Sequence, residues 1–338
     1  MIKAIELERP PRSPIMHAPL PAALIKYGEQ LIRLLQKYPS DFGPPPSRVP
    51  NPEELHPSYR RGLNRDEWGT LWHSSVDGIL GQPVDWPLKD WSKLEEYRFP
   101  PHISLKEVEK LKRRVEELHD KGYFVILGFK PGSFFEKLQH LRGFSNLLRD
   151  LVIKDPRLTR LADMLLEYCI ESISKVLEAK PDAISFADDW GTQSRLMIRP
   201  NLWREFFMPR YKEMFKLVHD HGCYVYFHSD GYIIPIIHDL ADIGVDVLNP
   251  QFSCHNLEEL ADVVRGKLCV SSDIDRQYVL PRGTVSEVKD YVKRVIELFG
   301  YENDGGLICR GEINYDVPLK NVKAMYDAFV KYGVYKWS

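Results

Sequence analysis

An imidazole and a carboxylate stand two positions apart directly after an apolar run of the chain. His228 and Asp230 follow the run YVYF (224–227) and precede a segment with helical character. An imidazole beside a carboxylate can move protons or bind a divalent cation. The spacing alone is a weak motif, because a structural or substrate-binding histidine fits it about as well as a metal ligand does.

Polar side chains also follow four other apolar runs, AISFA, VDVLN, KLCVSS and GLIC. These side chains are Asp188, Asp189, Asn249, Gln251, Asp273, Asp275, Arg310, Glu312 and Asn314. Any one of them, taken alone, is more simply explained as a helix cap or a turn residue. The ends of all five runs together are harder to explain in that way. Because parallel strands of a barrel end on one rim, we expect these groups to lie around a common opening.

Such a rim would concentrate negative charge around one imidazole. Mutual repulsion raises the pKa of some carboxyl groups unless a cation or a proton lies among them. Two chemistries fit this arrangement: metal-assisted activation of a nucleophile, and proton delivery by an acid with a raised pKa. His219 and His221 are left out of the site, since the end of a helix capped by Gly222 accounts for both.

From residue 120 onward, short apolar runs alternate with segments of helical length. This alternation predicts the strands and helices that must position the polar groups. The expected strands are 122–129, 183–187, 224–227, 245–249, 267–272 and 306–309. The expected helices lie near 134–148, 157–179, 201–221, 233–243, 256–265, 284–299 and 319–332. Continuous apolar strands separated by helices indicate a parallel sheet that is covered on both faces.

Two architectures satisfy this alternation, an open doubly wound sheet and a closed barrel of eight β/α units. No G-x-G-x-x-G or Walker sequence follows any strand, which removes the usual signature of the open nucleotide-binding form. We therefore predict an α/β protein, a (β/α)8 TIM barrel with an N-terminal extension wrapped around it. Two strands beyond the expected set are needed for closure, and the N-terminal region or a weak segment would supply them.

Residues 1–120 are rich in proline and tryptophan and are predicted to form an extension or lid packed on the barrel, with 121–338 as the main part of the barrel. One helix is expected at about 22–37, and two short strands are expected in 66–81 around the turn at Asp77 and Gly78. Trp68, Trp72 and Trp86 could line a pocket for a flat ligand, although core packing is the commoner role of such residues.

The composition excludes several classes of protein. A formal net charge of -2 over 338 residues gives no reason to expect a nucleic-acid partner. The five cysteines are scattered and never in C-x-x-C spacing, which argues against a disulfide framework and a cysteine-rich zinc site. The chain shows no signal-peptide core and no apolar run near the roughly 18 residues of a membrane span. We expect a cytoplasmic protein with no membrane partner.

Several blocks of the chain resemble, in order, the uroporphyrinogen decarboxylase superfamily, which includes the heme-pathway decarboxylase and the corrinoid-dependent methyltransferases. The blocks are DDWGTQ, YVYFHSDG, LADIGVDVLNPQ, SSDIDRQYVLPRGTVSEV and GEINYDVPLKN, within about 120–335. The resemblance implies a β/α barrel whose site lies at the carboxyl ends of the strands.

The decarboxylase branch carries an N-terminal motif of the form R-x-x-G-R-Y, which the nearest candidate, YRRGLNRDEWG (59–69), does not match. The methyltransferase branch carries H-x-C and a second, distant cysteine as ligands of a thiol-activating zinc. His228 matches the histidine, but Asp230 and Gly311 stand at the cysteine positions, with Glu312 adjacent. Hard oxygen donors replace soft thiolates, which favours a His/carboxylate metal site or no metal.

The resemblance thus implies an enzyme that moves a methyl group between a small oxygen- or nitrogen-bearing substrate and a corrinoid (cobalamin) held by a partner protein. His228, Asp230 and Glu312 would hold a divalent cation such as zinc or act as acid and base. The residues expected to shape the substrate site are Asp188, Asp189, Gln193, Tyr226, Gln251, Asp273, Arg310 and Asn314.

Two alternatives stay open. One is a carbon–carbon lyase that decarboxylates a tetrapyrrole, in which Arg195, Arg282 and Arg310 would bind carboxylates. The other is a non-catalytic protein that binds a corrinoid or a tetrapyrrole. A homodimer is compatible with either activity.

Overall fold

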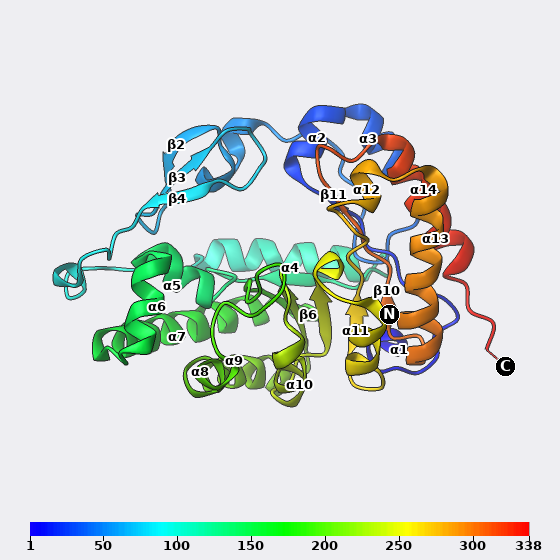
Figure 1. Ribbon diagram of the computed structural model, residues 1–338. Coiled ribbons are helices and arrows are strands. Elements are labelled where there is room, and N and C mark those ends of the chain that lie inside the picture. The colour runs from blue at the N-terminus through cyan, green and yellow to red at the C-terminus, as the bar shows by residue number, and fades with distance from the viewer. Residues whose placement is uncertain (338) are drawn as a thin grey trace.

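The computed structural model describes residues 1–337, and most of its barrel wall is one sheet of six parallel strands (Figure 1). The strands are adjacent in chain order: β5 (Ile126–Gly128), β6 (Ala183–Ala187), β7 (Tyr224–Ser229), β8 (Val247–Pro250), β9 (Cys269–Ser271) and β10 (Leu307–Ile308). Each pairs in parallel with the next. Parallel neighbours in chain order are what repeated β/α units produce.

The N-terminal region continues the wall beyond β10. Ile15 forms a parallel bridge with Cys309, and β1 (Ala18–Pro19) pairs in parallel with β11 (Glu312–Ile313). Residues 15–19 are therefore part of the barrel wall, and they lie in the N-terminal region that was named as one source of the missing strands.

The segment at Asp41 closes the remaining gap between the first and last parts of the wall. The amide of Asp41 donates to the carbonyl oxygen of Ile15 at 2.9 Å, and the amide of Phe124 donates to the carbonyl oxygen of Asp41 at 2.8 Å. These bonds link the strand at Ile15 to the segment that leads into β5. The predicted fold class, a TIM barrel of β/α units, is confirmed.

Helices surround the wall. They are α1 (Ile2–Ile5), α2 (Pro21–Tyr27), α3 (Glu29–Leu35), α4 (Leu105–His119), α5 (Phe135–Arg142), α6 (Phe144–Val152), α7 (Pro156–Leu177), α8 (Pro200–Phe206), α9 (Met208–Asp220), α10 (Ile234–Asp242), α11 (Leu257–Val264), α12 (Val279–Arg282), α13 (Val285–Val295) and α14 (Leu319–Tyr332). The helix expected near 134–148 is divided at Gly143, which has a φ of 85°. The helix expected near 201–221 is divided before Pro209, which lies in the first turn of α9 and cannot continue a preceding helix. Within the described residues no helix combines the length and apolar character needed to cross a bilayer.

A three-stranded antiparallel sheet stands above α5 and α6, outside the wall (Figure 1). Its strands are β2 (Gly62–Arg65), β3 (Leu71–Ser74) and β4 (Gln82–Asp85). β3 lies within the segment where two strands were expected, whereas β4 begins just after it. The carboxylate of Asp66 holds the turn between β2 and β3 by accepting hydrogen bonds from two backbone amides and from the indole of Trp72 at 2.9 Å.

Apolar side chains fill the amino end of the barrel. Ile5 of α1 belongs to a buried cluster with Phe124 and with residues near the starts of the strands, including Ala183 and Val247. α1 lies beside β10 at this end (Figure 1). The polar groups that follow the strands lie at the opposite, carboxyl end of the barrel. Barrel enzymes hold their active sites at that end.

Candidate active site

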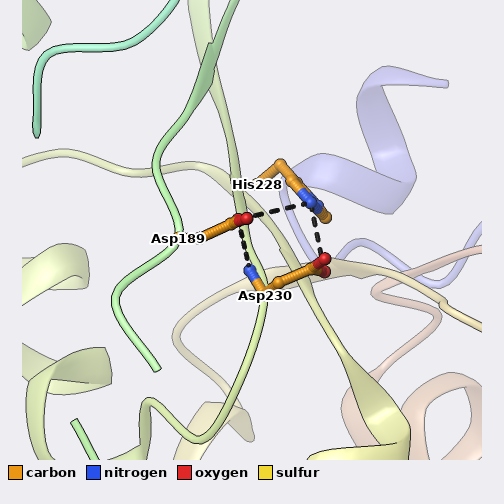
Figure 2. Close-up of side chains that lie close together, drawn as sticks. All are labelled: Asp189, His228 and Asp230. Carbon is orange, nitrogen blue, oxygen red and sulfur yellow. Dashed lines mark hydrogen bonds and ion pairs between the residues drawn. The ribbon is translucent and has the colours of Figure 1, made fainter. Parts of the chain in front are cut away.

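Asp189, His228 and Asp230 meet at the carboxyl ends of β6 and β7 (Figure 2). Nε2 of His228 lies 3.3 Å from Oδ1 of Asp230 and 3.9 Å from Oδ1 of Asp189. The backbone amide of Asp230 donates to Oδ1 of Asp189 at 2.9 Å. One candidate ligand atom from each residue lies within 4.8 Å of the others, a spacing at which one divalent cation could bind all of them.

Asn249 on β8 fixes the orientation and tautomer of His228. The side-chain NH2 of Asn249 donates to the carbonyl oxygen of Ser271 at 2.7 Å, which leaves its Oδ1 to face the imidazole. Nδ1 of His228 donates to that oxygen at 2.7 Å. Since Nδ1 carries a proton, Nε2 is the atom that can bind a metal or take a second proton, and it faces the two carboxylates.

The acids around His228 control its charge. Burial by itself lowers the pKa of His228, but the hydrogen bond and charge of Asp230, together with the charge of Asp189, raise the pKa to about 9. Burial would raise the pKa of Asp230, yet the contacts with His228 and Arg276 hold that pKa far below its usual range. Burial and the charge of Asp230 raise the pKa of Asp189. The neighbouring acids therefore favour the protonated form of the His228 imidazole.

Arg276 is a positive charge that lies among the acids at the rim. Its guanidinium pairs with Asp230, with Oε1 of Glu312 at 3.0 Å and with Oδ2 of Asp273 at 3.5 Å. Arg310 pairs with Oδ1 of Asp273 at 3.5 Å and with Oε2 of Glu312 at 3.6 Å. The two arginines and their acids form a mutually neutralising group beside the His228 cluster.

This arrangement changes the expected set of metal ligands. Glu312 was predicted as a ligand together with His228 and Asp230, but its carboxylate is paired with Arg276 and Arg310. Among residues 1–337, the group of candidate ligands that includes His228 is completed by Asp189, which was predicted only as a substrate-binding residue.

Asp188 does not lie at the rim with Asp189. Its side chain is completely buried, and it accepts hydrogen bonds from the amides of Phe134 and Glu136 at 2.7 Å each and from the hydroxyl of Tyr211 at 2.6 Å. Burial raises the pKa of Asp188 to about 6. The two amide bonds hold the start of α5 against β6, and the Tyr211 bond ties α9 to the same carboxylate. Asp188 therefore positions these helices and offers no free oxygen to a substrate.

The other predicted residues differ in their surroundings. Gln251 accepts a hydrogen bond from the amide of Gly231 at 2.9 Å, and the hydroxyl of Tyr226 donates to a serine on β9 at 3.0 Å. Gln193 is exposed and bonded to another glutamine, and Asn314 accepts from the amide of the residue that follows it. Gln251 thus holds the backbone next to Asp230, Tyr226 links β7 to β9, and the bond of Asn314 is that of a turn residue.

Two residues near the cluster were missed by sequence reasoning. Arg276 follows Asp273 by three positions in SSDIDR, and the excess of acids at the strand ends was a signal that a cation had to lie among them. Glu136 lies in α5 and does not directly follow a strand in the sequence, so no pattern marked it. Burial, with the charges of Asp189 and Asp188, raises its pKa well above the usual range.

The loops that carry Asp189 and Asp230 are in backbone contact. The amide of Gly191 donates to the carbonyl oxygen of Asp230 at 3.1 Å. Gly231 has a φ of 79°, and a Cβ at this position would lie 2.1 Å from the carbonyl carbon of Gly191. Only glycine fits this approach, which fixes the spacing between the two acidic residues.

The donor set does not fit a thiolate-bound zinc. Asp230 occupies one expected cysteine position, and at the other a Cβ on Gly311 would lie 2.2 Å from Sδ of Met325. An imidazole nitrogen and two carboxylates fit a divalent cation that accepts hard ligands, such as zinc in a nitrogen and oxygen site or manganese.

A family profile and one solved structure with a similar fold agree with this architecture. The family profile "Uroporphyrinogen decarboxylase (URO-D)" matches residues 80–332. A methyltransferase from Methanosarcina mazei has a similar structure, with a TM-score of 0.69, 17% sequence identity, and coverage of 97% of this chain and 96% of the other. A D-psicose 3-epimerase gives a TM-score of 0.40 at 11% identity, over 71% of this chain and 84% of the other. No curated protein matches the sequence. From the extent of the family match, the chain belongs to the uroporphyrinogen decarboxylase family.

Proposed function

We propose that this protein is a methyltransferase that moves a methyl group between a small substrate and a corrinoid carried by a partner protein. The observation that carries the proposal is the meeting of His228 with Asp189 and Asp230 at the barrel rim, with Nε2 directed at both carboxylates. Family membership supports it, because the family includes corrinoid-dependent methyltransferases. The similar fold of the Methanosarcina protein is compatible with it.

A divalent metal would be held by Nε2 of His228 and by carboxylate oxygens of Asp189 and Asp230, and it would act as a Lewis acid that lowers the pKa of a substrate oxygen or nitrogen. The hard donor set suits such a substrate better than a thiol. Asn249 holds the proton on Nδ1 and so keeps Nε2 available. Arg276 orients Asp230 and Glu312 by its ion pairs with both.

Decarboxylation of a tetrapyrrole is less well supported by the charges at the rim. A substrate with several carboxylates needs free cations, but Arg276 and Arg310 are both engaged by acids of the chain itself. The guanidinium of Arg282 faces the ring of Tyr278, with 5.7 Å between its central carbon and the ring centroid. A non-catalytic corrinoid-binding protein would keep the pocket but show no turnover.

The test combines metal analysis with corrin spectroscopy. Purified protein is loaded with zinc or manganese, and bound metal is measured in the wild type, in His228→Ala and in Asp230→Ala. His219→Ala is the matched control, because His219 also pairs with a carboxylate, Asp246 at 2.9 Å, but outside the cluster. We expect the first two variants to lose the metal and the control to keep it.

Methyl transfer is followed as the change in the corrin spectrum when methylcobalamin is incubated with the protein and a panel of oxygen and nitrogen acceptors. We expect turnover in the wild type and in His219→Ala but not in His228→Ala. Equal metal content in all variants would remove the metal from the proposal. Consumption of a porphyrinogen without any change of the corrin spectrum would favour the decarboxylase.

A further inference from the structure

A cavity of about 360 Å³ lies between the segment around β2 and β3 and the start of α5. Its walls include Tyr59, Trp68, Trp72, Glu136, Lys137 and His140. Pockets for small ligands commonly have volumes of roughly 300–1,000 Å³, so this cavity suits a compact molecule and not a tetrapyrrole.

A second hollow adjoins this cavity and includes a residue of the candidate active site in its lining. The second hollow has a volume of about 440 Å³ and shares Trp72, Leu80, Glu136 and His140 with the first. Its lining also includes Asp189. A molecule bound in the first cavity could therefore extend one end toward the cluster formed by Asp189, His228 and Asp230.

Lys137 is the unusual residue of the cavity wall. The residue is only 6% exposed, and its Nζ lies 4.4 Å from the centroid of the Trp68 ring. Among residues 1–337 no carboxylate forms an ion pair with this ammonium group and no acceptor forms a hydrogen bond with it. Two other acids of the cavity have partners, since Glu67 pairs with Lys130 at 3.4 Å and Asp66 accepts from Trp72. The carboxyl group of Glu136, which also lines the cavity, forms no ion pair with Lys137.

An ammonium group that is largely removed from water and has no ion pair is unfavourable. The charges of Asp66, Glu67 and Glu136 favour the protonated form of Lys137, but none of these carboxylates forms an ion pair with it. Burial lowers the pKa of Lys137, as expected for this situation. The cation–π contact with Trp68 offsets only part of the free energy that the ammonium group loses when it is removed from water. The ammonium group of Lys137 can therefore form an ion pair with an anionic ligand that enters the cavity.

We propose that this cavity binds the carboxylate of a small organic acid with a flat apolar body, with Lys137 as its counter-ion and the indoles of Trp68 and Trp72 as its walls. The molecule's other end would reach the hollow at Asp189. The assignment of this acid as methyl donor or acceptor rests on the proposed function, whereas its binding does not.

The probe is benzoate, titrated calorimetrically into the full-length protein in the absence of corrinoid. We expect benzoate to bind the wild type and to bind Lys137→Met roughly 10- to 100-fold more weakly, which is the usual effect of a hydrogen bond to a charged group. Lys130→Met is the matched control, since this lysine lines the same cavity but is paired with Glu67, and we expect its affinity to remain within about threefold of the wild type.

A second measurement does not depend on any variant. Benzamide has the shape of benzoate without the charge, and we expect the wild type to bind benzoate at least about tenfold more tightly. Equal affinities for the two probes, no benzoate binding by the wild type, or unchanged binding by a folded Lys137→Met would each overturn the proposal.

The two proposals can fail separately. His228→Ala should still bind benzoate if the cavity is as proposed, even where methyl transfer is lost. Turnover without any preference for the carboxylate would leave the proposed function standing and refute the cavity assignment.

Discussion

Replacing Asn249 with leucine should weaken metal binding while leaving every candidate ligand in place. Asn249 accepts the Nδ1 proton of His228 and donates to the carbonyl oxygen of Ser271, at 2.7 Å each. Leucine has a similar size and can do neither, so the ring is free to rotate or to move its proton to Nε2. Loss of such an outer partner commonly costs 10- to 100-fold in metal affinity, or about 1.4–2.7 kcal/mol.

The assay is a competitive titration of zinc against a chromophoric chelator, with dissociation constants compared between the wild type and Asn249→Leu. Thermal unfolding is measured in parallel, because the carbonyl oxygen of Ser271 loses its donor, which by itself costs stability by about 1–3 kcal/mol. Asn314→Leu is the control, since the side chain of Asn314 accepts only from the amide of its neighbour. An unchanged zinc affinity in Asn249→Leu, or an equal loss in Asn314→Leu, would refute the assigned tautomer.

Three further predictions concern the framework of the site. Arg142→Met should lower the free energy of unfolding by about 3 kcal/mol, measured with urea, because Arg142 and Asp150 form an ion pair at 2.7 Å with side-chain exposures of only 3% and 1%. The hydrogen bond to Asp246 raises the pKa of His219, so the stabilisation by His219 should be complete below its unfolded pKa of about 6.5 and disappear as the pH rises through the folded value. Gly231→Ala should abolish metal binding, since its Cβ would overlap the backbone of the loop after β6.

For each of these three predictions, one measured outcome would contradict it. A loss below about 1 kcal/mol in Arg142→Met would mean that Arg149, which also pairs with Asp150 at 3.2 Å, replaces it. A stability difference between wild type and His219→Gln that stays constant from about pH 6 to 9 would contradict the His219 assignment. Wild-type zinc affinity in Gly231→Ala would show that the two loops can separate without harm.

The strands that the sequence predicted well are those formed by an uninterrupted run of apolar residues. β6 coincides with the predicted strand at 183–187, and β7 begins at residue 224 as predicted. β1 was not predicted as a strand, because it has two residues, one of them Pro19, in a stretch interrupted by prolines. A proline lacks the amide that a strand donates, so such a segment reads as a linker from the sequence alone.

The rim could be predicted from the sequence, but the pairing of side chains within it could not. Asp189, His228 and Asp230 follow neighbouring strands, and parallel topology brings such positions together. Glu312 follows a strand as well, but its partner depends on the direction of its side chain, which Arg276 and Arg310 determine. Arg276 lies on a loop where no periodicity constrains its place, so only the balance of charge indicated it.

The filling of the amino end by Ile5 and its apolar neighbours has a consequence for the order of events in the proposed reaction. Small molecule and corrinoid protein would have to use the same mouth of the barrel. A docked macromolecule would then trap whatever lies beneath it, so the small substrate must enter first and its product can leave only after the larger partner has dissociated. An excess of that partner should accordingly slow steady-state turnover.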